Sequence, residues 1–250
     1  MIHSRPAALA MLVACALALA ACNRQSAAPA APSPSLADIR SPEGQKQVQE
    51  TVRQAALPAA DPSVPAARYQ KLDSGNQLMY MFYAVSGLPP DMERIANAVS
   101  QDYRGTTDGF RKQDIARTLQ PRVAAEIERA KSARYVIWET SDVPIERYDF
   151  ARKLFAVRPL YWDSGNSFYF NDNSGYHLSF SGGDAVRAFK VDDEGVARRI
   201  EASLSKFERL QMRLYVFARD ADMNNNTVKA QVVRIELLDA TGAVLAQAGP

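Results

Sequence analysis

The chain has 250 residues, of which 47% are hydrophobic and 23% charged, and its formal net charge at pH 7 is +2. These fractions are those of an ordinary globular protein. The near-neutral charge gives no reason to expect nucleic acid or an anionic membrane surface as a partner. Beyond position 22 the chain has no cysteine and one histidine, His177. That part of the chain therefore cannot form a disulfide, a thiolate zinc site, a two-histidine zinc site or a cysteine nucleophile.

An apolar run lies near the N-terminus, after Arg5, and covers residues 7–19. It is shorter than the ~20 apolar residues of a membrane-spanning helix. The run ends in Leu19-Ala20-Ala21-Cys22. This arrangement resembles a bacterial lipoprotein signal peptide with its lipobox. The resemblance implies cleavage before Cys22 and a lipid on the Cys22 thiol. An uncleaved membrane anchor and an ordinary secretory signal are the alternatives.

The same resemblance predicts where the protein resides. A lipidated Cys22 would anchor the protein to a membrane without threading it through. Asn23 stands where an aspartate would favour retention in the inner membrane, so we expect the outer membrane, facing the periplasm. Removal of 21 of the 250 residues leaves 229, and the formal charge falls from +2 to +1 because Arg5 is the charged residue lost.

The pattern of residue types divides the chain into three parts: a signal peptide at 1–21, a tether with a short helix at 22–67, and one domain at 68–250. The tether begins with an Ala/Pro/Ser-rich stretch at 23–35. Ser41 can cap a helix whose first position is Pro42. Its apolar face, which includes Val48 and Val52, is thin.

Residues 66–131 show helical spacing of apolar side chains. Gly87 is a plausible stop for the helix at 76–86. A second helix carries the clean stripe Met92, Ile95, Ala96, Val99 and Tyr103. A third begins at Thr107 or Asp108 and reaches residue 131, with Pro121 expected to restart or kink it.

After residue 133 the apolar period changes from 3.6 to 2, which predicts strands. A helix at 192–206 interrupts them. Short turns between neighbouring strands predict antiparallel pairing. The expected class is therefore α+β: helices first, then an antiparallel sheet with one inserted helix. The predicted strands are 134–140, 147–157, 167–171, 176–181, 185–191, 210–218, 227–238 and 243–247.

Aromatic residues are concentrated between positions 148 and 180. They can form a stacking surface for glycan or peptide, or simply the sheet core, and we favour the core because aromatic residues are common in strands. Tyr161 and Trp162 follow Pro159 and precede a turn, so we expect this pair to be exposed and to bind a ligand.

Three further motifs favour ordinary structure. The segment 220–231 resembles a calcium loop but lacks Gly at its sixth position and Glu at its twelfth, which favours a hairpin loop. Asp-Ser-Gly-Asn occurs at 73–76 and again at 163–166, and is common turn chemistry. A Ser-His-Asp triad would have to use His177. The sequence predicts neither a metal nor a cofactor.

A binding or envelope-assembly role is the function we expect. The alternative is an enzyme that acts on cell-envelope glycan through paired carboxylates. A structural accessory subunit of an envelope assembly is a third reading. The partners would be the membrane, through Cys22, and an envelope protein or glycan. The carboxylates near the aromatic region are Glu139, Glu146, Asp149, Asp163 and Asp172.

Overall fold

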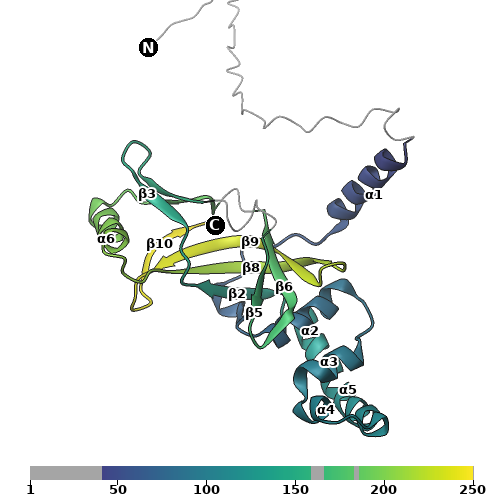
Figure 1. The fold of residues 1–250 in the computed structure, drawn as a ribbon. Coiled ribbons are helices and arrows are strands. Elements are labelled where there is room, and N and C mark those ends of the chain that lie inside the picture. Colours follow the sequence, from purple (N-terminus) through teal and green to yellow (C-terminus); the bar gives the residue numbers. More distant parts are fainter. Residues whose placement is uncertain (1–40, 159–165, 183–185, 250) are drawn as a thin grey trace, which may run out of the picture. The chain divides into compact units, whose positions relative to one another are not determined.

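The computed structural model describes residues 41–158, 166–182 and 186–249 (Figure 1). The chain divides into two compact units, residues 1–54 and residues 55–250. We call the second unit the body.

Helix α1 (Pro42–Ala56) forms most of the described part of the first unit. The Oγ atom of Ser41 accepts the N–H of Gly44 at 2.9 Å, and Pro42 takes the first helical position. The predicted start of this helix is therefore confirmed. Val52 is 63% exposed, so the apolar face of α1 is as open as its thin stripe indicates.

The helices of the body begin where short polar side chains cap them. Ser74, Asp91, Ser100 and Asp108 each accept at least one N–H from the first turn of the helix that follows. Gly87 ends the first of these helices in the left-handed conformation, at φ 68°. The capped helices are α2 (Gly75–Ser86), α3 (Met92–Val99), α4 (Gln101–Gly105) and α5 (Gly109–Ser132), and the short 3-10 helix η2 (Ala66–Arg68) precedes them after Pro65, which forms no side-chain cap.

Two sheets follow the helices. The larger has the strand order β1-β2-β8-β9-β6-β5, with β10 also paired to β9, and the smaller has the order β3-β4-β7. Helix α6 (Glu194–Ser205) is inserted among the strands. The strands are β1 (Gln70–Lys71), β2 (Tyr135–Thr140), β3 (Ile145–Asp149), β4 (Leu154–Val157), β5 (Phe168–Phe170), β6 (Asn173–Ser181), β7 (Ala188–Lys190), β8 (Gln211–Asp222), β9 (Thr227–Leu238) and β10 (Val244–Ala248).

The α+β class is confirmed, but the larger sheet is mixed. Strands β1 and β2 are parallel, and so are β6 and β9. Short turns predict antiparallel pairing only for the strands that they join. Strands β6 and β9 are instead separated in the chain by β7, α6 and β8, and such a long connection allows parallel neighbours.

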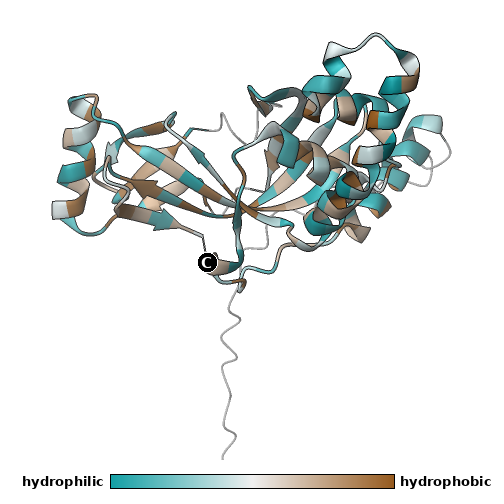
Figure 2. Cartoon of the chain, turned by 90° about the horizontal axis from the view of Figure 1, so that it is seen from below, coloured by the Kyte–Doolittle hydropathy of each residue, from teal (hydrophilic) through white to brown (hydrophobic). Residues whose placement is uncertain are grey.

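The core lies between the larger sheet and α2. Leu78, Met79 and Phe82 of α2 are at most 2% exposed, and Leu214 and Ile235 of the sheet are completely buried. The same core cluster extends to Phe155 and Phe189 of the smaller sheet and Ile200 of α6, and the hydropathy colouring alternates along the strands (Figure 2). Helices α3 to α5 lie at one end of the sheet, whereas α6 and β3 lie at the other (Figure 1).

The opposite face of the larger sheet carries aromatic and charged residues. The Tyr69 ring packs edge-on against Tyr135 and Tyr215, with centroid distances of 5.2 and 5.1 Å. The guanidinium carbon of Arg234 lies 3.9 Å from the Tyr215 ring centroid. The backbone N–H of Asp61 donates to the Tyr135 hydroxyl at 2.7 Å. The segment that follows α1 is therefore attached to the sheet as part of the body.

The turn between β5 and β6 closes on the N-terminus of α2. The Asp172 carboxylate accepts the N–H of Gly75 at 2.8 Å and the Ser74 hydroxyl at 2.7 Å. Burial alone would raise the pKa of Asp172, but these hydrogen bonds outweigh burial, so the pKa lies below its usual value. The Asp-Ser-Gly-Asn segment at 73–76 thus begins helix α2, and Asp172 in the distant turn completes the cap of that helix.

Asp172→Asn should lower the free energy of unfolding by about 1 kcal/mol near neutral pH, because a charged acceptor is lost at a helix N-terminus. The folded-state pKa is lowered, so the stabilisation is present above the unfolded pKa of about 3.9 and is lost as the pH falls through the folded pKa. Urea melts at a series of pH values measure this. If the stability difference between wild type and Asp172→Asn grew as the pH fell, the lowered pKa assigned to Asp172 would be wrong.

Candidate functional site

A groove of about 790 Å³ lies between α6 and the hairpin formed by β3 and β4. We call it the α6 groove. Its volume is within the ~300–1,000 Å³ of small-molecule and cofactor sites. It is lined by Arg147, Tyr148, Phe150, Lys153, Glu194, Ala197, Arg198, Glu201, Ala202 and Ser205.

The hairpin wall corrects the prediction of one long strand at 147–157. The chain turns at residues 150–153, and Lys153 takes a left-handed conformation with φ 53°. Asp149 stabilises the turn, because its Oδ1 atom accepts the N–H groups of Ala151 and Arg152, both at 2.9 Å. Apolar residues lie on both sides of the turn, so the two strands resemble one long strand, although Arg152 and Lys153 interrupt the period-2 pattern. The turn leaves the Phe150 side chain 83% exposed.

Phe150 is held in place on the hairpin wall. Its ring packs edge-on against Tyr148, with the centroids 5.1 Å apart. Tyr148 in turn packs on the buried Phe155, and its hydroxyl donates to the Val191 carbonyl at 2.8 Å. An exposed aromatic ring is thus supported by a partly buried one, an arrangement suited to an anchor in an interface.

Glu201 of α6 joins the helix to the hairpin. Its carboxylate accepts the backbone N–H of Tyr148 at 2.6 Å and the Arg147 guanidinium at 2.8 Å. Arg147 also donates to the Ser205 hydroxyl at 2.8 Å. Because β3 is the outer strand of its sheet, Glu201 satisfies an N–H that would otherwise be open to pairing.

The C-terminal end of α6 carries a second exposed phenylalanine. Lys206 is the C-cap and Phe207 follows it at φ 54°, in the left-handed conformation that usually selects glycine. The Glu208 N–H donates to the Ser203 carbonyl at 2.9 Å, which is the 6→1 hydrogen bond of a Schellman motif. The Phe207 side chain is 94% exposed. Phe207 therefore occupies a position where the left-handed backbone favours glycine and the exposure to solvent favours a polar residue.

Phe207→Gly is expected to raise the free energy of unfolding by up to about 1 kcal/mol, because glycine adopts the left-handed conformation without strain. Phe110, which is 84% exposed within α5, is the matched control. Phe110→Gly should instead lower stability by up to about 0.5 kcal/mol, because glycine has the lower helix propensity and Phe110 is the second residue of α5. Thermal and urea melts compare the two variants. Destabilisation by Phe207→Gly would show that the side chain has contacts that stabilise the fold.

Several site residues predicted from the sequence lie outside the described residues. They are Cys22, Tyr161, Trp162 and Asp163. Among the other aromatic residues, Phe155, Tyr176 and Phe180 are buried in the core, as favoured, whereas Phe150 and Tyr169 are exposed.

The four described candidate carboxylates lie in separate environments. Glu139 accepts the Arg213 Nε–H at 2.8 Å, Asp149 stabilises its own turn, and Asp172 caps α2. Glu146 is exposed on β3. The geometry therefore gives Glu139, Asp149 and Asp172 structural partners and does not favour a catalytic pair among the four.

The segment that resembles a calcium loop forms a hairpin turn between β8 and β9. The Oδ1 atom of Asp222 accepts the N–H of Asn224 at 3.0 Å within the turn from β8 to β9, as a hairpin loop requires. No group of three or more His, Cys, Asp or Glu residues in the described ranges is placed to hold a metal ion. The His177 ring lies 6.1 Å from the Tyr169 ring.

The α6 groove was not predicted from the sequence. Its walls are far apart in the chain, with Tyr148 and Glu201 separated by 53 positions. Two local signals were present in the sequence. Asp149 is a residue type that favours turns, and Phe207 is an apolar residue directly after a helix end.

No family model, curated protein or solved structure matches this chain. Among the described residues, no helix combines the length and apolarity needed to cross a membrane.

Proposed function

We propose that this protein is a lipoprotein of the cell envelope, anchored through Cys22 to the outer membrane and facing the periplasm, and that its body binds a protein partner through the α6 groove. The Leu19-Ala20-Ala21-Cys22 pattern supports the anchoring. The binding role rests on one observation: the supported, exposed Phe150 ring lies at a groove large enough for a ligand.

The charges of the groove favour a protein segment as its ligand. Arg147 pairs with Glu201 at 2.8 Å, and Arg198 lies 3.6 Å from Glu194. Lys153 adds one further positive charge to the lining. Paired charges around an exposed aromatic ring resemble the polar rim and central anchor of protein interfaces. The partner should therefore insert an apolar side chain beside Phe150 and place a carboxylate near Lys153.

Site-specific crosslinking in intact cells tests the binding role. A photoreactive phenylalanine analogue at position 150 should give an adduct of discrete mass, whereas the analogue at the equally exposed Phe110 of α5 should not. Ala202→Trp, which fills the groove from α6, should abolish the adduct. An adduct that glycan-degrading enzymes remove, or no adduct despite full incorporation, would contradict a protein partner in this groove.

The anchoring makes a separate prediction. Cys22→Ser should remove the lipid and release the protein from the membrane fraction, because the apolar run at 7–19 is too short to span a bilayer. Palmitate labelling and cell fractionation measure both effects, with wild type as the control. A Cys22→Ser protein that stays with the membrane after a carbonate wash would refute lipid anchoring.

A further inference from the structure

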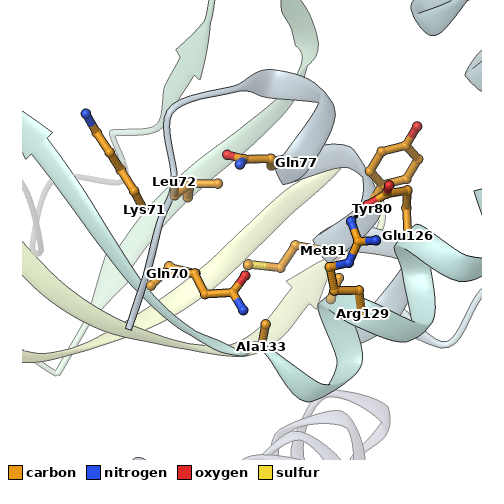
Figure 3. A pocket seen from close by; sticks show the side chains of 11 residues that line it. Gln70, Lys71, Leu72, Gln77, Tyr80, Met81, Glu126, Arg129 and Ala133 are labelled. Carbon is orange, nitrogen blue, oxygen red and sulfur yellow. Dashed lines mark hydrogen bonds and ion pairs between the residues drawn. The ribbon is translucent and has the colours of Figure 1, made fainter. Parts of the chain in front are cut away.

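A second cavity, of about 160 Å³, lies at the opposite end of the body from α6, between α2, α5 and the edge of the larger sheet (Figure 3). We call it the α2–α5 pocket. Its floor is apolar: Leu72, Met81 and Val136 are 2%, 4% and 3% exposed. An apolar cavity of ~150 Å³ accommodates benzene, so this pocket has the volume for one side chain of medium size.

The rim of the pocket offers uncharged hydrogen-bonding groups. Gln70, Gln77 and Tyr80 surround the opening (Figure 3). Within the described part of the chain, the Gln70 amide and the Tyr80 hydroxyl have no hydrogen-bond partner. Burial, and then Glu126, raise the pKa of Tyr80, so its hydroxyl remains a neutral donor.

The charged residues at the pocket are neutralised or turned away. Glu126 and Arg129 pair with each other at 2.5 Å. The Lys71 ammonium points away from the cavity and lies 3.6 Å from Glu139 (Figure 3). No surplus charge therefore faces the opening, and a charged side chain would lose its hydration there without a partner.

The pocket adjoins an open strand edge. Strand β1 is the terminal strand of the larger sheet and pairs in parallel with β2. Leu72 donates its N–H to the Ile137 carbonyl at 2.8 Å, and Lys71 is the residue opposite Ile137. Because alternate residues bond to the neighbour in a parallel ladder, the N–H and C=O of Lys71 point away from β2. Among the described residues nothing pairs with these two groups, so they are available to an added strand.

We propose that the α2–α5 pocket binds one uncharged apolar side chain, of leucine or methionine size, carried by an extended peptide segment of a partner that pairs with β1. Gln70 of β1 and Leu72, which directly follows β1, are two positions apart and lie on the same face, and both line the pocket. An added strand would present its alternate side chains to this same face. Backbone hydrogen bonds at an edge together with a side-chain pocket are the basis of peptide recognition by strand addition.

The test uses the mature chain with Cys22→Ser and short blocked peptides as probes. Acetyl-Ser-Leu-Ser-methylamide should give saturable NMR shifts at the methyl groups of Met81 and Val136. This peptide should bind at least about tenfold more tightly than the same peptide with alanine or aspartate in place of leucine. Alanine leaves the pocket unfilled, and aspartate carries a charge. Equal binding of all three peptides, or no saturable shifts, would overturn the proposal.

Two variants separate the pocket from other surfaces. Ala133→Leu should fill the pocket and weaken binding at least about tenfold, whereas Ala202→Leu in the α6 groove should leave it unchanged. Ala130→Leu replaces Ala133→Leu if that variant does not give a folded spectrum. Binding that survives both pocket variants would overturn the assignment.

A modified probe tests the strand pairing. N-methylation of the peptide groups on both sides of the leucine removes the donors that β1 would need, and should weaken binding at least about tenfold. Equal binding of the methylated peptide would refute strand addition. A failure of this experiment leaves the crosslinking result at Phe150 unaffected, since the two sites lie at opposite ends of the body.

Discussion

Glu236→Ala should destabilise the protein by about 2–4 kcal/mol, because the loss of this buried carboxylate leaves Arg213 with Glu139 as its one remaining described carboxylate partner and Arg234 with the Tyr215 ring alone. The Glu236 side chain is 9% exposed. Its Oε2 atom accepts the Arg213 guanidinium at 3.1 Å and the Tyr215 hydroxyl at 3.0 Å, and its Oε1 atom lies 3.6 Å from Arg234. Within the described residues the buried Arg234 Nε has no hydrogen-bond partner, so beside Glu236 the guanidinium relies on its contact with the Tyr215 ring.

Glu128→Ala is the matched control for Glu236→Ala. Glu128 pairs with Lys131 at 2.6 Å on α5, but its side chain is 68% exposed. An exposed pair of this kind contributes about 0.2–0.5 kcal/mol. Urea unfolding of both variants at neutral pH measures the difference. A loss below about 1 kcal/mol for Glu236→Ala would mean that water reaches the cluster and that the outer face of the sheet is not tightly covered.

Gly75→Ala is the second substitution with a large expected effect. A Cβ atom at Gly75 would lie 2.5 Å from the carbonyl oxygen of Asn173 and 2.9 Å from its Cβ. The turn between β5 and β6 would have to move away from α2, which would break the hydrogen bonds of Asp172 to Ser74 and Gly75. We expect a loss of about 2–4 kcal/mol, from overpacking together with the lost hydrogen bonds.

Gly109→Ala provides the comparison for Gly75→Ala. Both glycines occupy the first position of a helix, but a Cβ atom at Gly109 would meet no described atom within 4 Å beyond its chain neighbours and its own helix backbone. Alanine there should be neutral or stabilising by up to about 1 kcal/mol. Should both variants prove equally stable, the close approach of the turn to α2 would be wrong.

The local elements of this protein follow from its sequence because their causes lie within a few residues. Ser74, Asp91 and Asp108 cap the helices that they precede, and Gly87 ends α2. The alternation along β8 predicts one apolar face, and its residues Met212, Leu214, Val216 and Ala218 are completely buried. Caps, turns and periodicity act through neighbours in the chain, so the α+β class can be predicted without tertiary information.

The tertiary structure alone decided which segments meet. The parallel pairing of β6 with β9, the contact of Asp172 with Gly75 across 97 positions, and that of Glu201 with Tyr148 across 53 positions are all long-range. Many alternative pairings satisfy the same local pattern. The choice among them depends on packing the whole core at once. Both candidate sites are formed by such contacts, so the sequence determined the elements that line them, and only the fold placed those elements together.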